Sequence, residues 1–481
     1  MTFEVIDEGH PLPVEMEIKE QLHRGLKPRH LQLIALGGII GSGYFLGTGY
    51  VVQHAGPGAF ISYILGGFIV LCVMYCLGEL AVAMPHSGSF VQYANDLISP
   101  SWACGVGWSY WLTWVSYVPS EMIAGGLIME HFAPFLSAPQ WAICFGLIVT
   151  TINLLHVKIF GEVEFWLALT KIIAITMFTI VAALIAFGVI GHEQVHSQIH
   201  VNFSFLSDFS AMFPHGILAI LMTMVIIMVN FQGAEIVGLA AGESKDPATS
   251  IPMAIRGISW RIIALYVIPV FLLVSIFPWG KLEVDRSVFS VALQSYGFEW
   301  SGIVFTIVVL IASISCSLSG LYGCTRVMHS LAKAGMAPRI FSKLNRHHVP
   351  QNATILSTMS CWIGILIFVL DPNKKIYTIL LSVSGFSGAI AWISICWSQY
   401  NFRKKVINDS SKIARLKFKT PFFPYLTLFA IWAQVICLAV VAFNVELRPA
   451  FYVGLPLLLV PIIWHRFYGS VAKFKITSWF V

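Results

Sequence analysis

Three ionisable side chains lie inside long apolar stretches of the sequence. They are Glu121 in YVPSEMIAGG, Lys171 in GEVEFWLALTK and Glu235 in NFQGAE. A carboxyl or amino group among apolar residues is costly to keep charged, so it tends to exchange a proton or to pair with a polar ligand. The alternatives are a structural hydrogen bond for either glutamate, and a lysine whose ammonium reaches out to the edge of the apolar layer. All three residues are candidates for proton or ligand chemistry.

Two clusters of small and polar residues also interrupt apolar stretches. Glycines crowd LGGIIGSGYFLGTG at 36–49, where each costs about 1 kcal/mol relative to alanine in a helix. Asn, Gln, Gly and Glu stand together in NFQGAE at 230–235. Close helix packing through Gly37 and Gly41 would explain the first cluster alone. Interruption of both helices would explain both clusters, because interrupted helices expose backbone groups that can bind a polar substrate.

The elements that carry these residues are expected to be helices in a membrane. Of the 481 residues, 57% are hydrophobic and 11% are charged, whereas a soluble domain carries roughly 25% charged residues. The apolar residues form runs such as 141–155 and 303–315, unlike the alternating pattern of a β-barrel. The composition therefore predicts one all-α polytopic membrane domain. The polar segment before Leu31 has no apolar core, so we expect no cleaved signal peptide.

Hydropathy predicts about twelve transmembrane helices. Their ranges are 31–52, 57–83, 103–129, 140–157, 163–190, 214–240, 260–279, 300–326, 352–370, 376–399, 424–445 and 449–466. Two interrupted helices, each opening a five-helix half, indicate a five-plus-five inverted repeat with two additional C-terminal helices. The predicted segments are a cytoplasmic tail (1–30), helices 1 to 5 (31–190), helices 6 to 10 (214–400), helices 11 and 12 (424–466) and a second cytoplasmic tail (467–481).

The basic residues indicate the orientation of the chain. If both termini are cytoplasmic, loops and tails on that side hold 23 of the 29 Lys and Arg residues, and the other side holds five. The positive-inside rule then predicts a multi-pass protein of the plasma or bacterial inner membrane. The basic segment 403–419 fits contact with anionic membrane lipid better than nucleic acid binding. We interpret Glu79 as an interfacial residue that ties down the loop after it.

No familiar catalytic motif is present in the sequence. It contains no P-loop, no HExxH and no GxSxG motif, and its nine cysteines form no CxxC pair. We therefore predict no enzyme activity, no ATP use, no cofactor and no metal site. Uphill movement of a solute through such a protein would need an ion gradient or exchange.

Six motifs, in order along the chain, resemble those of one family. They are GLKPRHLQLIALGGIIGSGYF, HAGPGAFISY, LGELAVAMPHSGSF, FGEVEFWLALTK, GLAAGESKDP and SGLYGCTRVMHSLAKAGMAPRIFSKLNRHHVP. From about Gly25 to Lys405 the chain resembles the amino acid permeases. More narrowly, it resembles the bacterial and fungal amino acid transporter family of the amino acid, polyamine and organocation superfamily. The resemblance implies a LeuT-like fold and amino acid transport.

The resemblance also implies a substrate site at the two interruptions. In similar proteins the turn around Ser42 donates backbone N–H groups to the substrate carboxylate, since the start of a helix favours an anion. The Ile39 carbonyl would accept from the substrate ammonium. Phe231 would close over the substrate, unless it is an ordinary packed or lipid-facing residue. The predicted substrate-binding residues are Ile39, Gly41, Ser42, Gly43, Phe231, Gly233 and Glu235.

Proton coupling is assigned to Lys171 and Glu121. In proteins similar to this one, the matching lysine ammonium occupies the place where sodium-driven relatives bind their ion. A fixed cation there would remove the need for sodium, and loss of its proton offers a route to coupling. We therefore expect import of amino acids, mainly neutral ones, by proton symport with alternating access. An amino acid or amine exchanger on the same fold, and a receptor that binds without transporting, are the alternatives.

Overall fold

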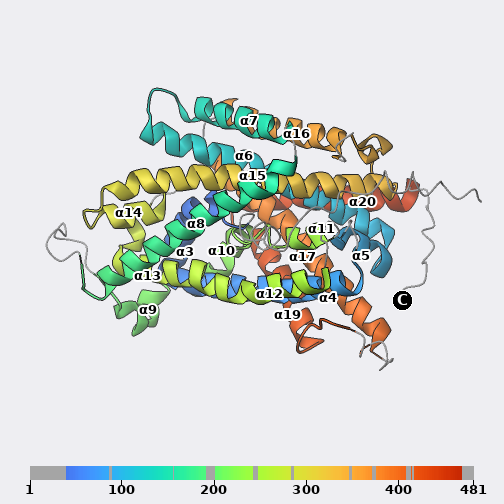
Figure 1. Cartoon of the computed structure of the whole chain (residues 1–481). Coiled ribbons are helices and arrows are strands. Elements are labelled where there is room, and N and C mark those ends of the chain that lie inside the picture. Colours follow the sequence, from blue (N-terminus) through green and yellow to red (C-terminus); the bar gives the residue numbers. More distant parts are fainter. Residues whose placement is uncertain are drawn as a thin grey trace, which may run out of the picture.

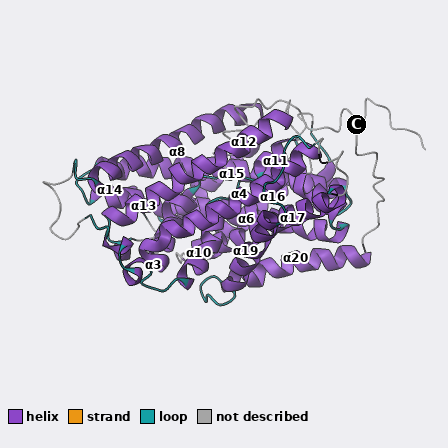
Figure 2. Ribbon diagram, turned by 90° about the horizontal axis from the view of Figure 1, so that it is seen from below, coloured by secondary structure: helices purple, strands orange, loops and turns teal. Residues whose placement is uncertain are grey.

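The computed structural model describes residues 39–85, 89–154, 157–190, 201–241, 247–282, 286–345, 349–370, 375–407, 413 and 416–468. Within these ranges every regular element is a helix. Figure 1 shows the long helices lying side by side in one bundle, and Figure 2 shows the same bundle turned by 90°. The all-α class predicted from composition is therefore confirmed.

The helices follow the apolar ranges of the sequence. The longer elements are α3 (Thr48–Ala55), α4 (Ala59–Ala83), α5 (Ser89–Leu97), α6 (Pro100–Phe132), α7 (Ala138–Leu154), α8 (Val157–Ala186), α10 (Leu218–Val229), α11 (Ile236–Ala241), α12 (Pro247–Ile262), α13 (Ile268–Ile276), α14 (Val288–Gln294), α15 (Trp300–Lys333), α16 (Gln351–Leu370), α17 (Lys375–Val406), α19 (Tyr425–Val441) and α20 (Arg448–Tyr468). The shorter ones are η1 (Gly43–Gly47), η2 (Gly56–Gly58), η3 (Ser204–Leu206), α9 (Phe209–Met212), η4 (Ile263–Val267), η5 (Trp279–Lys281) and η6 (Arg339–Ser342). The predicted N-terminal tail and residues 31–38 lie outside the described residues, as does the predicted C-terminal tail beyond residue 468.

Seven helical segments in the described part of the chain are long and apolar enough to cross a membrane. The helices α10 and α19 are apolar but shorter. One of the seven segments, Gly43–Ala83, contains both α3 and α4, which meet at Gly56 with a φ of +67°. The number of these segments therefore does not give the number of membrane crossings. The polytopic membrane class is supported, whereas the twelve crossings and the inverted repeat stay predictions.

Large apolar side chains remain exposed on the outer helices. A water-soluble protein rarely leaves so many of them in contact with solvent, whereas a hydrocarbon surrounding imposes no such requirement. Examples more than half exposed occur on five different helices, namely Trp166, Ile180, Trp260, Met359, Leu366, Trp432 and Val460. This surface suits contact with lipid.

The helix α6 runs through the centre of the bundle, packed along α15 and α17. Ser99 caps its first turn by accepting a hydrogen bond from the Trp102 N–H at 3.2 Å, and Pro100 occupies the first helical position. Pro119 lies inside the helix, where it removes one backbone donor. The residues of α6 around this proline are buried, so α6 carries Glu121 into the middle of the protein.

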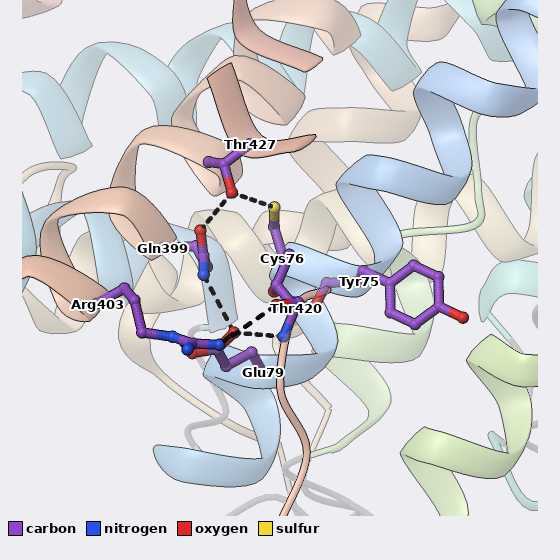
Figure 3. A network of polar contacts seen from close by, with 7 residues as sticks. All are labelled: Tyr75, Cys76, Glu79, Gln399, Arg403, Thr420 and Thr427. Carbon is purple, nitrogen blue, oxygen red and sulfur yellow. Dashed lines mark hydrogen bonds and ion pairs between the residues drawn. The ribbon is translucent and has the colours of Figure 1, made fainter. Parts of the chain in front are cut away.

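A buried polar network fastens α4 to α17 and to the segment before α19 (Figure 3). The Glu79 carboxylate accepts hydrogen bonds from Arg403 Nε at 2.6 Å and from Arg403 Nη2 at 2.8 Å. It also accepts from Gln399 Nε2 at 3.0 Å and from the Thr420 N–H at 2.7 Å. The side chain is fully buried and ties α4 to α17 and Thr420 rather than to the loop after it, whereas its position at the membrane interface stays a prediction. Arg403, which is distant from Glu79 in the sequence, compensates the charge of the Glu79 carboxylate.

Candidate functional site

At the first glycine-rich cluster, a helix begins at Ser42, and the residues before 39 lie outside the described residues, so an interruption there stays a prediction. Residues 39–41 are not helical, and helical residues run from Ser42 through η1 into α3. The Ser42 N–H donates to both carboxylate oxygens of Glu121, at 3.1 and 3.0 Å. The start of a helix attracts an anion. Glu121 therefore occupies the kind of position that we predicted for a substrate carboxylate.

Gly41 permits this contact because it has no side chain. A Cβ at this position would clash with the Tyr117 hydroxyl and would lie 2.6 Å from Glu121 Oε1. A Cβ at Gly43 would lie 2.8 Å from Asn230 Oδ1, which belongs to the second glycine-containing cluster. The two clusters are therefore neighbours in the fold.

At the second interruption, α10 ends at Val229 and α11 begins at Ile236, with turns between them. Gly233 has a φ of +104°, a conformation that favours glycine. Its N–H donates to the two carboxylate oxygens of Glu235, at 3.3 and 3.1 Å. The predicted interruption of the range 214–240 is confirmed.

Protein donors surround the Glu235 carboxylate. Besides Gly233, it accepts from the Tyr110 hydroxyl of α6 at 2.9 Å and from Trp392 Nε1 of α17 at 3.0 Å. This is the arrangement of a structural glutamate that braces the interruption against two central helices. Contact between Glu235 and a substrate stays a prediction.

Among the residues that the structure describes, several buried polar atoms near the interruptions make no hydrogen bond. Asn230 Nδ2 donates to the Tyr63 hydroxyl at 2.7 Å, and Thr48 Oγ1 lies 2.6 Å from the same hydroxyl. In contrast, Asn230 Oδ1 and the Tyr266 hydroxyl make no hydrogen bond with any residue the structure describes. Buried polar atoms are seldom left in this state. A polar ligand or water between the interruptions would satisfy both.

Phe231 belongs to a cluster of four buried rings, with Tyr44, Tyr63 and Tyr266. Its ring centroid lies 4.6 Å from that of Tyr266 and 6.2 Å from that of Tyr63. The Tyr44 and Tyr266 centroids are 4.4 Å apart. Phe231 is fully buried, so the lipid-facing alternative is excluded. A lid over substrate and an ordinary packed residue both fit these contacts.

Phe231→Ala is expected to raise the KM of uptake about tenfold, because a lost ring contact of about 1.4 kcal/mol is a tenfold change in affinity. Uptake kinetics in liposomes would measure this change. Phe178→Ala is the matched control, since Phe178 is equally buried but packs against Phe289 and Phe305. A KM that rises equally in both variants, or in neither, would contradict a lid role for Phe231.

Lys171 is fully buried on α8, which excludes an ammonium that reaches the membrane surface. Its Nζ donates to Ser315 Oγ of α15 at 2.8 Å, and Ser315 Oγ donates to Glu164 Oε1 at 2.5 Å. Sequence reasoning did not select Glu164 as a site residue. Its position two helical turns before Lys171 was the available signal, because that spacing places both side chains on one face.

The comparisons with known proteins give one consistent result. The chain matches the family model of the amino acid permeases over residues 30–477. It belongs to the amino acid permease family. Among its relatives in this family is the amino-acid permease RocE of Bacillus subtilis (strain 168), which is 39% identical over 92% of this chain and 95% of the relative. The lysine-specific permease LysP of Escherichia coli (strain K12) is 35% identical over 93% of each chain. The gamma-aminobutyric acid permease of Bacillus subtilis (strain 168) is 36% identical over 87% of this chain and 88% of the relative.

Membership of the amino acid permease family confirms the resemblance carried by the sequence motifs and supports amino acid transport. All nine predicted site residues lie inside the matched range. Among the residues that the structure describes, no group of three or more His, Cys, Asp and Glu side chains is arranged to hold a metal ion. The polar chemistry available at the interruptions is that of carboxylates, hydroxyls and amides.

Proposed function

We propose that this member of the amino acid permease family imports amino acids by proton symport. The observation that carries the proposal is the contact between the Glu121 carboxylate and the Ser42 N–H. A substrate carboxylate that binds at the same helix start must displace Glu121, because two like charges repel each other at one site. A proton on Glu121 removes that competition. Binding of substrate and binding of a proton are thereby linked.

We further infer that the substrate is a neutral amino acid. Both Glu121 and Glu235 already accept hydrogen bonds from protein donors, so their oxygen atoms are occupied and less available to a basic side chain. Ile39 and the backbone around Phe231 would supply carbonyl groups for the substrate ammonium. The relatives do not decide the substrate, because one is named lysine-specific and another is named for gamma-aminobutyric acid.

We infer transport by alternating access on a fold of twelve helices with a five-plus-five inverted repeat. The adjacent interruptions support this, since they supply a central site between helices that can move. The distribution of 23 of the 29 Lys and Arg residues on one predicted side supports two cytoplasmic termini. It also supports a location in the plasma or bacterial inner membrane.

Uptake by purified protein in liposomes tests the proposal. Labelled acidic, neutral, aromatic and basic amino acids would be supplied with and without an inward proton gradient. We expect accumulation of a neutral amino acid that collapses when the gradient is dissipated. Glu121→Gln should still take up substrate down its gradient, but without accumulation driven by protons. Uptake that appears only against internally loaded amino acid would replace symport with exchange.

A further inference from the structure

Three buried polar side chains form a continuous hydrogen-bonded chain between α8 and α15. Lys171 Nζ donates to Ser315 Oγ at 2.8 Å, and Ser315 Oγ donates to Glu164 Oε1 at 2.5 Å. All three side chains are at most 1% exposed. Both bonds run in the same direction, from the ammonium through the hydroxyl to the carboxylate. This is the geometry that a proton needs to pass along a hydroxyl group.

Among the residues that the structure describes, few other ionisable groups approach this hydrogen-bonded chain. Cys316 of α15 and Glu121 of α6 approach the Lys171 ammonium. The Ser319 hydroxyl of α15 approaches the Glu164 carboxyl group. Of the other elements packed on α8, α13 and α14 contain no ionisable residue, and η4 contains Tyr266. The chain therefore lies between Glu121 on one side and the N-terminal end of α8 on the other.

We propose that Ser315 relays a proton between Lys171 and Glu164, and that Glu164 is the next proton carrier after the predicted coupling residues. In the step, a Lys171 N–H bond breaks as an O–H bond forms at Ser315. At the same time the original Ser315 O–H bond breaks and an O–H bond forms at Glu164 Oε1. An ammonium and a carboxylate become an amine and a carboxylic acid, so protons and charge balance. The neutral pair is accessible because burial disfavours both charged forms.

The relay moves the proton toward the beginning of α8. Glu164 precedes Lys171 by seven residues, which corresponds to about 10 Å along a helix. If both termini are cytoplasmic, as in the proposed function on which this inference rests, the beginning of α8 faces the cytoplasm. A proton that enters with substrate near Glu121 would then leave through Lys171, Ser315 and Glu164. Exchange of labelled for unlabelled substrate needs no such exit, because the proton can stay on the protein in both directions.

Ser315→Ala tests the relay, because it removes the connecting hydroxyl and keeps both ionisable groups. In liposomes loaded with a pH-sensitive dye, we expect net uptake and proton influx to fall about 100-fold, the usual contribution of a positioned proton carrier. Exchange of labelled substrate against internal unlabelled substrate should stay close to the wild-type rate. Glu164→Gln should likewise lower net uptake and proton influx while exchange stays close to the wild-type rate. Ser315→Thr retains the hydroxyl and should therefore keep net uptake close to that of the wild type.

Ser317→Ala is the matched control. Ser317 is fully buried on the same helix, but its hydroxyl donates to the Ser313 carbonyl at 2.7 Å, outside the relay. This variant should keep both activities. Equal loss of net uptake and exchange in folded Ser315→Ala, or retention of both, would overturn the relay. If Ser315→Ala does not fold, the comparison of net uptake with exchange in Glu164→Gln tests the relay instead. A wild-type protein without proton influx would instead refute the proposed symport, before any variant is compared.

Discussion

Gly41→Ala is expected to lower the rate of amino acid uptake on the order of 100-fold, because forcing an extra methyl group into a packed site costs about 3 kcal/mol. The new Cβ would clash with the Tyr117 hydroxyl and would lie 2.6 Å from Glu121 Oε1. Both side chains are buried, so relief requires Glu121 to leave the Ser42 N–H or Tyr117 to change rotamer. Either movement alters the helix start that the proposal assigns to the substrate carboxylate. Initial rates of labelled uptake in liposomes would measure the loss.

Gly280→Ala is the control for Gly41→Ala. A Cβ at Gly280 would meet no atom within 4 Å, so this variant should transport like the wild type. Both variants should be checked for equal amounts of folded protein in the membrane. Wild-type uptake by folded Gly41→Ala would show that the contact between Glu121 and Ser42 can be disturbed without consequence.

Glu79→Ala is expected to destabilise the folded protein by about 3–5 kcal/mol, the usual effect of removing one partner of a buried ion pair. Arg403 would keep a buried charge without its carboxylate, and the Thr420 N–H would lose its acceptor. The link between α4 and α17 would then be broken. The thermal unfolding midpoint of the detergent-solubilised protein, followed by size-exclusion chromatography after heating, would report the change.

Two comparisons identify the cause of this loss. Glu446→Ala removes a carboxylate that lies 3.9 Å from His54 in an exposed pair, and its effect should stay within about 1 kcal/mol. The double variant Glu79→Ala/Arg403→Ala removes the uncompensated charge and should recover part of the stability. A Glu79→Ala midpoint equal to that of Glu446→Ala would contradict a stabilising role for the network.

Hydropathy predicted helices well where the apolar run is long. The predicted range 352–370 became α16 (Gln351–Leu370), and the predicted 57–83 became α4 (Ala59–Ala83). The predicted range 260–279 began too late, because helical structure continues from Pro247 through α12 and η4 to the end of α13. The segment PATSIPMAIRGISWRI of α12 mixes polar and apolar residues. A search for continuous apolar runs therefore does not detect it.

The sequence alone was sufficient for the helical membrane class, the family and the positions of the unusual residues. The NFQGAE cluster marked the interruption between α10 and α11, and glycine density marked the helix start at Ser42, because such residues are unfavourable inside a regular apolar helix. Glu121, Lys171 and Glu235 were recognisable because an ionisable group among apolar residues is costly. These are local properties, and they can be recognised from neighbouring residues in the sequence.

The tertiary structure decided which groups meet. Glu121 contacts Ser42 across 79 positions, Ser315 contacts Glu164 across 151, and Arg403 contacts Glu79 across 324. Helices that are apolar on all sides have no polar face to reveal how they are rotated against one another. Side-chain packing among helices distant in sequence sets that rotation. Hence the sequence identified the candidate polar residues, whereas only the packed bundle shows which of them contact one another.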